Sequence, residues 1–243
     1  TSDVDALRAA VDASGHPALF VVDAVATLGA MPLRFDAQRI DVVVGASQKG
    51  LMLPPGIGFV AVGPAAAEVS RRNTSPRFYW DWTRRMGEQP YRKFCGTPPL
   101  NLLMGMEAGL KLLFAEGIAA VHHRHRLLSS AVHAAVAAWS EEGAVDFFCK
   151  VPAARSVSVT AVAVREGIDP EALRALARER FQVSIAGGLG PLAGRVFRIG
   201  HLGDLNAPMI LGALAGVEGA LLASGIPIGR DGLRRAIDTI VLG

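Results

Sequence analysis

Residues 18–23 read ALFVVD, a short and continuous apolar run that ends in one charged side chain, Asp23. A strand that is buried on both faces reads in this way, because helices cover both sides of a parallel sheet. Two similar runs follow at residues 41–45 and 57–62. Strands that recur at this spacing, with helical sequence before and between them, predict an α/β architecture built on a parallel sheet.

The rest of the chain continues this alternation. Asp169 followed by Pro170 predicts the start of a helix, since Asp accepts hydrogen bonds at the N-cap and Pro fits the first helical position. The sequence Asn206-Ala207-Pro208 predicts a second capped helix near the end of the chain. A domain boundary is expected near residues 115–135, inside a helix. Helical spacing covers residues 3–13, 100–133 and 172–180, and strands are expected at 156–164 and 195–199.

Composition limits the class of protein. The chain has 243 residues, of which 51% are hydrophobic and 19% charged, and this excludes intrinsic disorder. It contains no membrane-spanning run and no signal peptide at its first residues, so no membrane partner is expected. Two cysteines cannot build a disulfide framework, which favours a cytoplasmic location. The apolar content leads us to expect that some surface is covered by a partner subunit or by further chain.

Residues 71–93 combine basic and aromatic side chains. Seven Lys and Arg residues stand there against two acidic ones, Asp81 and Glu88, and five aromatic residues are interleaved with them. Such a pattern is typical of some nucleic-acid surfaces, and a non-catalytic nucleic-acid binder is therefore kept as an alternative. No nucleic-acid fold signature accompanies the segment, so a connecting segment is the favoured interpretation and no nucleic-acid partner is expected.

The most informative segment is residues 45–56, which read GASQKGLMLPPG. Lys49 follows a buried strand directly and is flanked by small residues. A lysine in a desolvated pocket can act as a nucleophile toward carbonyl groups. Asp23 is placed in the same way at the end of its own strand, where ligands bind in α/β sheets. A lysine and a carboxylate placed together suit pyridoxal phosphate, whose aldehyde and ring nitrogen need these two groups.

The chain resembles the class V, fold-type I aminotransferases over about residues 1–230. The resemblance is carried by residues 22–29 (VDAVATLG), 47–59 (SQKGLMLPPGIGF), 79–82 (YWDW) and 197–204 (FRIGHLGD), and it is closest to the serine–glyoxylate and alanine–glyoxylate branch. It implies a three-layer α/β/α large domain, of which residues 1–120 form the C-terminal part, and a small α+β domain at residues 121–243. It also implies a homodimer with shared active sites, and a segment preceding residue 1 that this chain lacks.

The resemblance implies roles for individual residues. Lys49 corresponds to the catalytic lysine that holds pyridoxal phosphate covalently, and Asp23 to the carboxylate at the pyridine nitrogen. Val25 corresponds to a residue packed on the ring, and Gln48 to a phosphate ligand. A second phosphate contact, Thr97, is implied to come from the neighbouring subunit. Arg198 corresponds to the arginine that binds the substrate carboxylate. One departure is Phe94, where some relatives place a tyrosine that reaches the phosphate.

The resemblance therefore implies transamination of a small amino acid, serine before others, with glyoxylate as acceptor, giving hydroxypyruvate and glycine. Alanine, aspartate, ureidoglycine or an aminophosphonate as donor are alternatives within the family. A sulfur-transferring lyase is a further one, but neither Cys95 nor Cys149 stands in a glycine-rich catalytic loop.

Other residues carry weaker signals. His122, His123 and His125 form a cluster in which two rings could share a helix face, and a solvated face is preferred to a metal site. The glycine-rich residues 187–194 are interpreted as a loop that lets the chain turn beside Arg198. His201 is interpreted as a packed or capping residue rather than a catalytic one.

Overall fold

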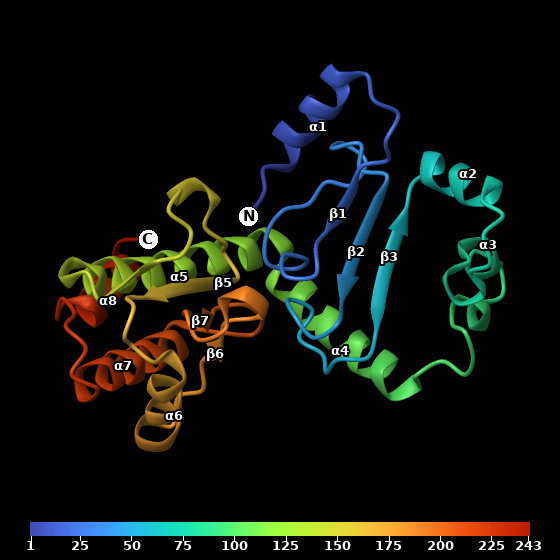
Figure 1. The fold of residues 1–243 in the computed structure, drawn as a ribbon. Helices are drawn as coiled ribbons and strands as arrows, with labels where there is room; N and C mark the ends of the chain where they lie inside the picture. The colour runs from blue at the N-terminus through green and yellow to red at the C-terminus, as the bar shows by residue number, and fades with distance from the viewer. The chain divides into compact units, whose positions relative to one another are not determined.

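The computed structural model describes residues 1–243, apart from the side chain of Pro90, and the chain divides into two compact units. The first unit is residues Ser2–Glu116, and the second is residues Gly117–Gly243 together with Thr1. Each unit has its own sheet and its own helices (Figure 1). The predicted domains at residues 1–120 and 121–243 stay a prediction.

The first unit is built on a three-stranded sheet in the order β1-β2-β3. Strand β1 runs parallel to β2, with Asp23 opposite Val44, and β2 runs antiparallel to β3. Figure 1 shows the three strands side by side, with α4 near the carboxyl end of β2. The elements of this unit are α1 (Val4–Ser14), β1 (Val21–Asp23), β2 (Val42–Ala46), β3 (Gly58–Val62), α2 (Pro64–Arg72), η1 (Phe78–Trp80), α3 (Trp82–Arg85), η2 (Pro90–Lys93) and α4 (Leu100–Glu116).

Two features of this sheet differ from the sequence prediction. The prediction of a parallel sheet is wrong for β3, because the connection from Ala46 to Gly58 contains no helix that could carry the chain back across the sheet. Burial of the first strand on both faces is also wrong, since Val21 is 57% exposed. Strand β1 lies at the edge of the sheet in this unit, and its pairing with β2 leaves one side of it open.

The second unit is an antiparallel sheet with four helices. The strand order is β4-β5-β7-β6, and Arg198 of β7 stands between Ala161 of β5 and Ala186 of β6. The elements are α5 (Ile118–Trp139), η3 (Ser140–Glu142), β4 (Val145–Phe147), η4 (Pro152–Ala154), β5 (Val159–Val164), α6 (Pro170–Phe181), β6 (Ala186–Gly187), η5 (Gly190–Leu192), β7 (Val196–Gly200), α7 (Ala207–Ala223) and α8 (Gly232–Leu242).

One face of this sheet forms the main core. Phe147, Val162 and Phe197 are cross-strand neighbours on that face and are buried among side chains of all four helices. The neighbouring positions on the strands point to the other face, which carries Arg198. The sheet therefore uses one face for stability and leaves the other for a polar side chain.

Local signals placed several helices correctly. Asp3 accepts a hydrogen bond from Ala6 N at the start of α1, Asp169 accepts one from Glu171 N at the start of α6, and Asn206 accepts one from Met209 N at the start of α7. One long helix at residues 100–133 was expected, and this is wrong. Gly117 has φ +89° and separates α4 from α5, because this backbone conformation cannot continue an α-helix.

None of the helices in the described part of the chain combines the length and the apolar character that crossing a bilayer requires.

His201 belongs to the buried interior of the second unit. Its Nδ1 bonds to Val157 O at 3.0 Å and its Nε2 to Thr160 Oγ1 at 2.8 Å. Burial lowers the pKa of His201 to about 4, and burial likewise lowers the pKa of His133, whose ring lies 6.1 Å from that of His201, to about 4. The expected packed role of His201 agrees with this placement.

These histidines predict loss of stability in mild acid. The unfolded state takes up protons near the ordinary histidine pKa, about 6.5, and the folded state only near 4. The free energy of unfolding should therefore keep its full value, as far as these histidines affect it, above about pH 6.5, and it should fall as the pH drops toward 4. Thermal unfolding followed by circular dichroism across this range should show the fall, and His201→Asn should flatten it. His123→Asn, at an exposed position of α5, is the control; equal slopes in all three proteins would contradict the prediction.

Candidate functional site

Asp23 ends β1 and starts a tight turn. Its Oδ1 accepts a hydrogen bond from Val25 N at 2.8 Å, and the side chain remains exposed. The next residue, Ala24, is fully buried, and its N–H donates to Val44 O of β2 at 2.8 Å. The chain then coils, with Leu28 N donating to Ala24 O at 2.8 Å. The carboxylate is therefore held by its own turn, with a part of it open to solvent.

Lys49 lies in the loop that follows β2, and Ser47 anchors this loop. Ser47 is fully buried; its hydroxyl donates to Pro54 O at 2.8 Å and its N–H donates to Ile57 O at 3.0 Å. Met52 N in turn donates to Lys49 O at 2.9 Å. Lys49 itself is exposed. The loop thus has a rigid base, and the amine is presented from it rather than buried, as would suit a group that meets an incoming molecule.

Glycines bring the Asp23 turn and the Lys49 loop into direct backbone contact. A Cβ on Gly50 would lie 2.3 Å from Leu28 O, and a Cβ on Gly29 would lie 2.9 Å from Gly50 O. Gly29 also has φ +83°, which favours glycine. A Cβ on Gly45 would meet the Leu28 side chain at 2.8 Å. These glycines have no role in the sequence prediction, although each stands next to a predicted site segment.

Helix α4 packs against the same loop. A Cβ on Gly109 would lie 2.8 Å from Leu51 O and 3.4 Å from the Leu53 side chain. Gly109 and Leu53 are both buried. The Lys49 loop is therefore held between the turn that follows Asp23 and the backbone of α4.

The other predicted cofactor residues are distributed over the first unit. Gln48 is exposed beside Lys49, and Val25 is half-buried in the Asp23 turn. Thr97 lies instead in the lining of a cavity of about 680 Å³ between β3 and residues 79–99. Neither Asp23 nor Lys49 lines this cavity. The structure thus brings Asp23, Val25, Gln48 and Lys49 onto two packed loops and places Thr97 in a separate cavity.

Arg198 belongs to the second unit and lies in β7. Its Nε donates to Gly187 O at 2.7 Å, and this is the guanidinium's one hydrogen bond among the residues that the structure describes. The side chain is half-buried. Because Nε is engaged, the two terminal nitrogens can pair with the two oxygens of a carboxylate. The glycine-rich loop after β6 turns beside Arg198, as expected from the sequence.

Two histidines hold the chain that follows Arg198. His201 N donates to Ser158 O at 2.9 Å in addition to the ring contacts described above. His125 of α5 is buried; its Nδ1 bonds to Val121 O at 2.7 Å, and its Nε2 accepts from Gly203 N at 3.1 Å. The expected solvated histidine face on α5 is therefore wrong for His125. Within the described part of the chain, no group of three His, Cys, Asp or Glu side chains is arranged to hold a metal ion.

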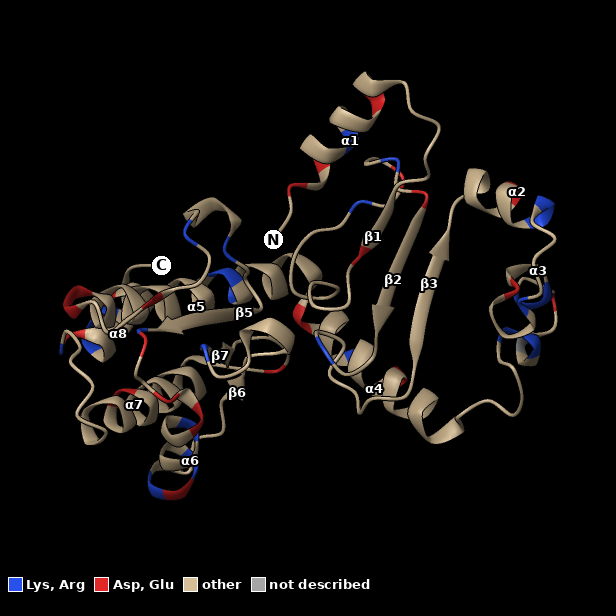
Figure 2. Cartoon of the chain, viewed as in Figure 1, with Lys and Arg blue, Asp and Glu red and all other residues tan. Residues whose placement is uncertain are grey.

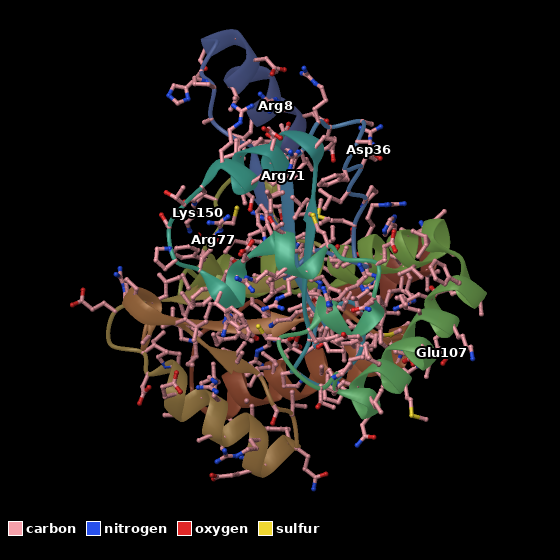
Figure 3. The ribbon with its side chains drawn as sticks, turned by 90° about the vertical axis from the view of Figure 1, so that its right-hand side faces the viewer. Arg8, Asp36, Arg71, Arg77, Glu107 and Lys150 are labelled. Carbon is pink, nitrogen blue, oxygen red and sulfur yellow. The ribbon has the colours of Figure 1, made fainter. Side chains whose placement is uncertain are left out.

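Several basic residues of 71–93 form hydrogen bonds or ion pairs with residues close to them in the sequence. Arg77 donates to Ser75 O at 3.1 Å and also to Ser70 O, and Arg85 donates to Phe78 O at 3.1 Å. Arg71, on α2, pairs with Glu68 at 2.5 Å. Figure 2 shows basic positions gathered at the end of α2 and around α3, and Figure 3 labels Arg71 and Arg77. Arg77 and Arg85 thus bond to backbone carbonyls, several of them in an irregular stretch, and the sequence pattern did not reveal this structural use.

The Gly50 contact makes a testable prediction. Gly50→Ala should lower the free energy of unfolding by about 1–3 kcal/mol, because its methyl group meets a backbone carbonyl that cannot rotate away. Urea unfolding measures this change. Gly58→Ala, at the start of β3, is the control, since its Cβ meets nothing closer than 4.0 Å. Equal stability of both variants would contradict the role given to Gly50.

Comparison with known proteins identifies the family of the chain. The family model described as aminotransferase class-V matches residues 1–192. The chain is 40% identical over 233 residues to a serine–glyoxylate aminotransferase of Methylorubrum extorquens, covering 94% of this chain and 57% of that protein. It is 39% identical over 228 residues to an L-aspartate–glyoxylate aminotransferase of Paracoccus denitrificans, covering 93% of this chain and 56% of that protein.

Solved structures give the same result. A pyridoxamine–pyruvate aminotransferase from Mesorhizobium loti superposes with a TM-score of 0.85 at 30% identity, over 98% of this chain and 61% of that one. The ureidoglycine–glyoxylate aminotransferase of Bacillus subtilis gives a TM-score of 0.83 at 28% identity, again over 98% of this chain and 61% of that one. The chain thus spans somewhat more than half the length of these relatives. Its fold is the α/β fold of the fold-type I enzymes, and the chain belongs to the class V aminotransferase family.

Proposed function

We propose that the complete protein transfers the amino group of a small L-amino acid, serine before others, to glyoxylate. The observation that carries this proposal is the glycine-mediated contact that holds the Asp23 turn against the Lys49 loop. Both segments follow neighbouring parallel strands, so a carboxylate and an amine are presented at the same edge of the sheet.

Class V aminotransferases depend on pyridoxal phosphate, and the residues present fit this cofactor. Lys49 offers an exposed amine for the aldehyde, and Asp23 offers a carboxylate for the ring nitrogen. When bound, pyridoxal phosphate supplies an electron-withdrawing ring that stabilises negative charge on the α-carbon of the amino acid. Val25 would pack on the ring and Gln48 would donate its amide to the phosphate.

The chain's own residues would then act at stated atoms. The Nζ of Lys49 would take the proton from the α-carbon of the amino acid and deliver it to the carbon that derives from the cofactor's aldehyde, which is general acid–base catalysis. The Asp23 carboxylate holds a positive charge at the ring nitrogen by pairing with it. The terminal nitrogens of Arg198 bind the substrate carboxylate and fix the direction of the α-hydrogen.

We further propose that the complete enzyme is a homodimer. Thr97 would then serve the phosphate of the neighbouring subunit, in keeping with its place in a cavity that neither Asp23 nor Lys49 lines. Phe94, which lines the same cavity, has no hydroxyl to add to that contact. The first unit would be part of the large domain and the second the small domain. A cytoplasmic location is proposed from the two free cysteines, Cys95 and Cys149.

The identity of the amino donor is the most specific part of the proposal. Serine–glyoxylate aminotransferases from Methylorubrum extorquens and Hyphomicrobium methylovorum are both 40% identical to the chain, which supports serine. The L-aspartate–glyoxylate and ureidoglycine–glyoxylate aminotransferases support the same acceptor with other donors. Glyoxylate is therefore better supported than serine.

Replacement of Lys49 tests the chemistry. Lys49→Ala should abolish transamination by the complete protein, because no other amine is expected to move the α-proton. Borohydride reduction of the wild-type protein followed by peptide mapping should place the cofactor label on Lys49. Gln48→Ala, at the neighbouring exposed position, should weaken cofactor binding and leave the label on Lys49. Turnover by Lys49→Ala above a trace, or a label elsewhere, would refute the assignment.

Replacement of Arg198 tests substrate binding. Arg198→Ala should raise KM for the amino acid and for glyoxylate by roughly 10- to 100-fold, since it removes charge-assisted hydrogen bonds of about 1.5–3 kcal/mol. Steady-state kinetics with serine, alanine and aspartate as donors measures this change and identifies the preferred donor. Unchanged KM values would remove Arg198 from the carboxylate site, and a donor other than serine would correct the proposed substrate alone.

A further inference from the structure

The hydrogen-bond partner of Arg198 lies on a short strand at the edge of its sheet. Its neighbour β6 is the edge strand and contains two residues, Ala186 and Gly187, before a further glycine. Short, glycine-rich edge strands have a poorly specified register and open easily. Yet the carbonyl of Gly187 is the acceptor that orients the guanidinium of Arg198. Something outside the strand ladder must therefore hold β6 in place.

Helix α6 supplies that support. Arg174 donates from its Nε to Ile185 O at 2.9 Å, and its terminal nitrogen pairs with Glu171 one turn earlier. A Cβ on Gly187 would lie 2.7 Å from Arg174 Nη1 and 2.7 Å from Glu171 Oε1. The Arg174–Glu171 pair thus bonds to the chain at Ile185, directly before β6, and lies so close to Gly187 within β6 that no Cβ would fit there.

Arg198 has no acidic partner among the residues that the structure describes, and its side-chain hydrogen bond there is the one with Gly187 O. Its two cross-strand neighbours in the sheet are both alanines, Ala161 and Ala186, which offer no polar side chain. The direction of its guanidinium therefore depends on the Gly187 carbonyl, and that carbonyl depends on α6.

We infer that Arg174 is a positioning residue for the substrate-binding arginine. Through the backbone of β6 it fixes the Gly187 carbonyl, which engages Nε of Arg198 and leaves both terminal nitrogens for the substrate carboxylate. This inference rests on the proposed role of Arg198 and extends it to a residue on another element. Arg174 acts only through Arg198, so its effect should disappear when Arg198 no longer has its Nε–H.

The test uses Arg174→Met in the complete, cofactor-loaded protein. KM for serine and glyoxylate should rise roughly threefold to tenfold with kcat within about twofold, because the orientation of the carboxylate contact is loosened while its charge remains. Calorimetry with propionate, a carboxylate that cannot react, should show the same loss of affinity. Arg174→Lys keeps the charge near Glu171 and should recover part of it.

Two further proteins make the result specific. Arg178→Met, one turn later on α6, is the matched control, since Arg178 is exposed and its one polar contact among the described residues is with Glu179, at 3.4 Å, and not with the chain before β6. This variant should bind propionate as the wild type does. In the Arg198→Lys background, which lacks Nε–H, Arg174→Met should cause no further loss. An additive loss there, or an unchanged propionate affinity in Arg174→Met, would overturn the inference and leave the role of Arg198 intact. Unchanged affinity in Arg198→Lys would overturn both.

Discussion

The backbone of residues 28–30 lies directly on the backbone of Gly50, and no side chain separates the two. Each partner has glycine at the point of contact, and a single methyl group on either would overlap a carbonyl or come closer to it than ordinary packing allows. The contact fixes the position of the Asp23 turn relative to the Lys49 loop, and these two loops follow neighbouring strands. The Asp23 turn and the base of the Lys49 loop are each tied by their own hydrogen bonds, so the glycine contact joins two rigid pieces.

Sequence reasoning works best where a feature is local. The predicted caps at Asp169 and Asn206 are confirmed, because the N–H that each side chain binds lies within three positions. Asp23 and Lys49 were singled out because each is the single charged side chain that follows an apolar strand, and their roles stay predictions. The direction of β3 depends instead on the absence of a helix between two strands, and the exposure of Val21 on which strands surround it. A periodic pattern of apolar residues predicts neither the direction of a strand nor which strands lie beside it.

The same distinction applies to the site. The Gly29–Gly50 contact joins two separate loops of the chain. The sequence around a loop glycine does not indicate which backbone segment will pack against it. His125 was grouped with its neighbours on charge, but its ring accepts a hydrogen bond from Gly203 across 78 positions of sequence. The arginines of residues 71–93 were expected in a connecting segment, but the sequence pattern did not show that several of them bond to backbone carbonyls of this irregular segment, whose polar groups need partners.

The open setting of Arg198 has a consequence for solution chemistry. A guanidinium with no carboxylate paired to it in the described residues attracts small oxyanions of any kind. Sulfate, phosphate or acetate in a buffer would therefore compete, at its two terminal nitrogens, with the carboxylate that we propose to bind there. The apparent affinity for that carboxylate should then depend on the composition of the buffer.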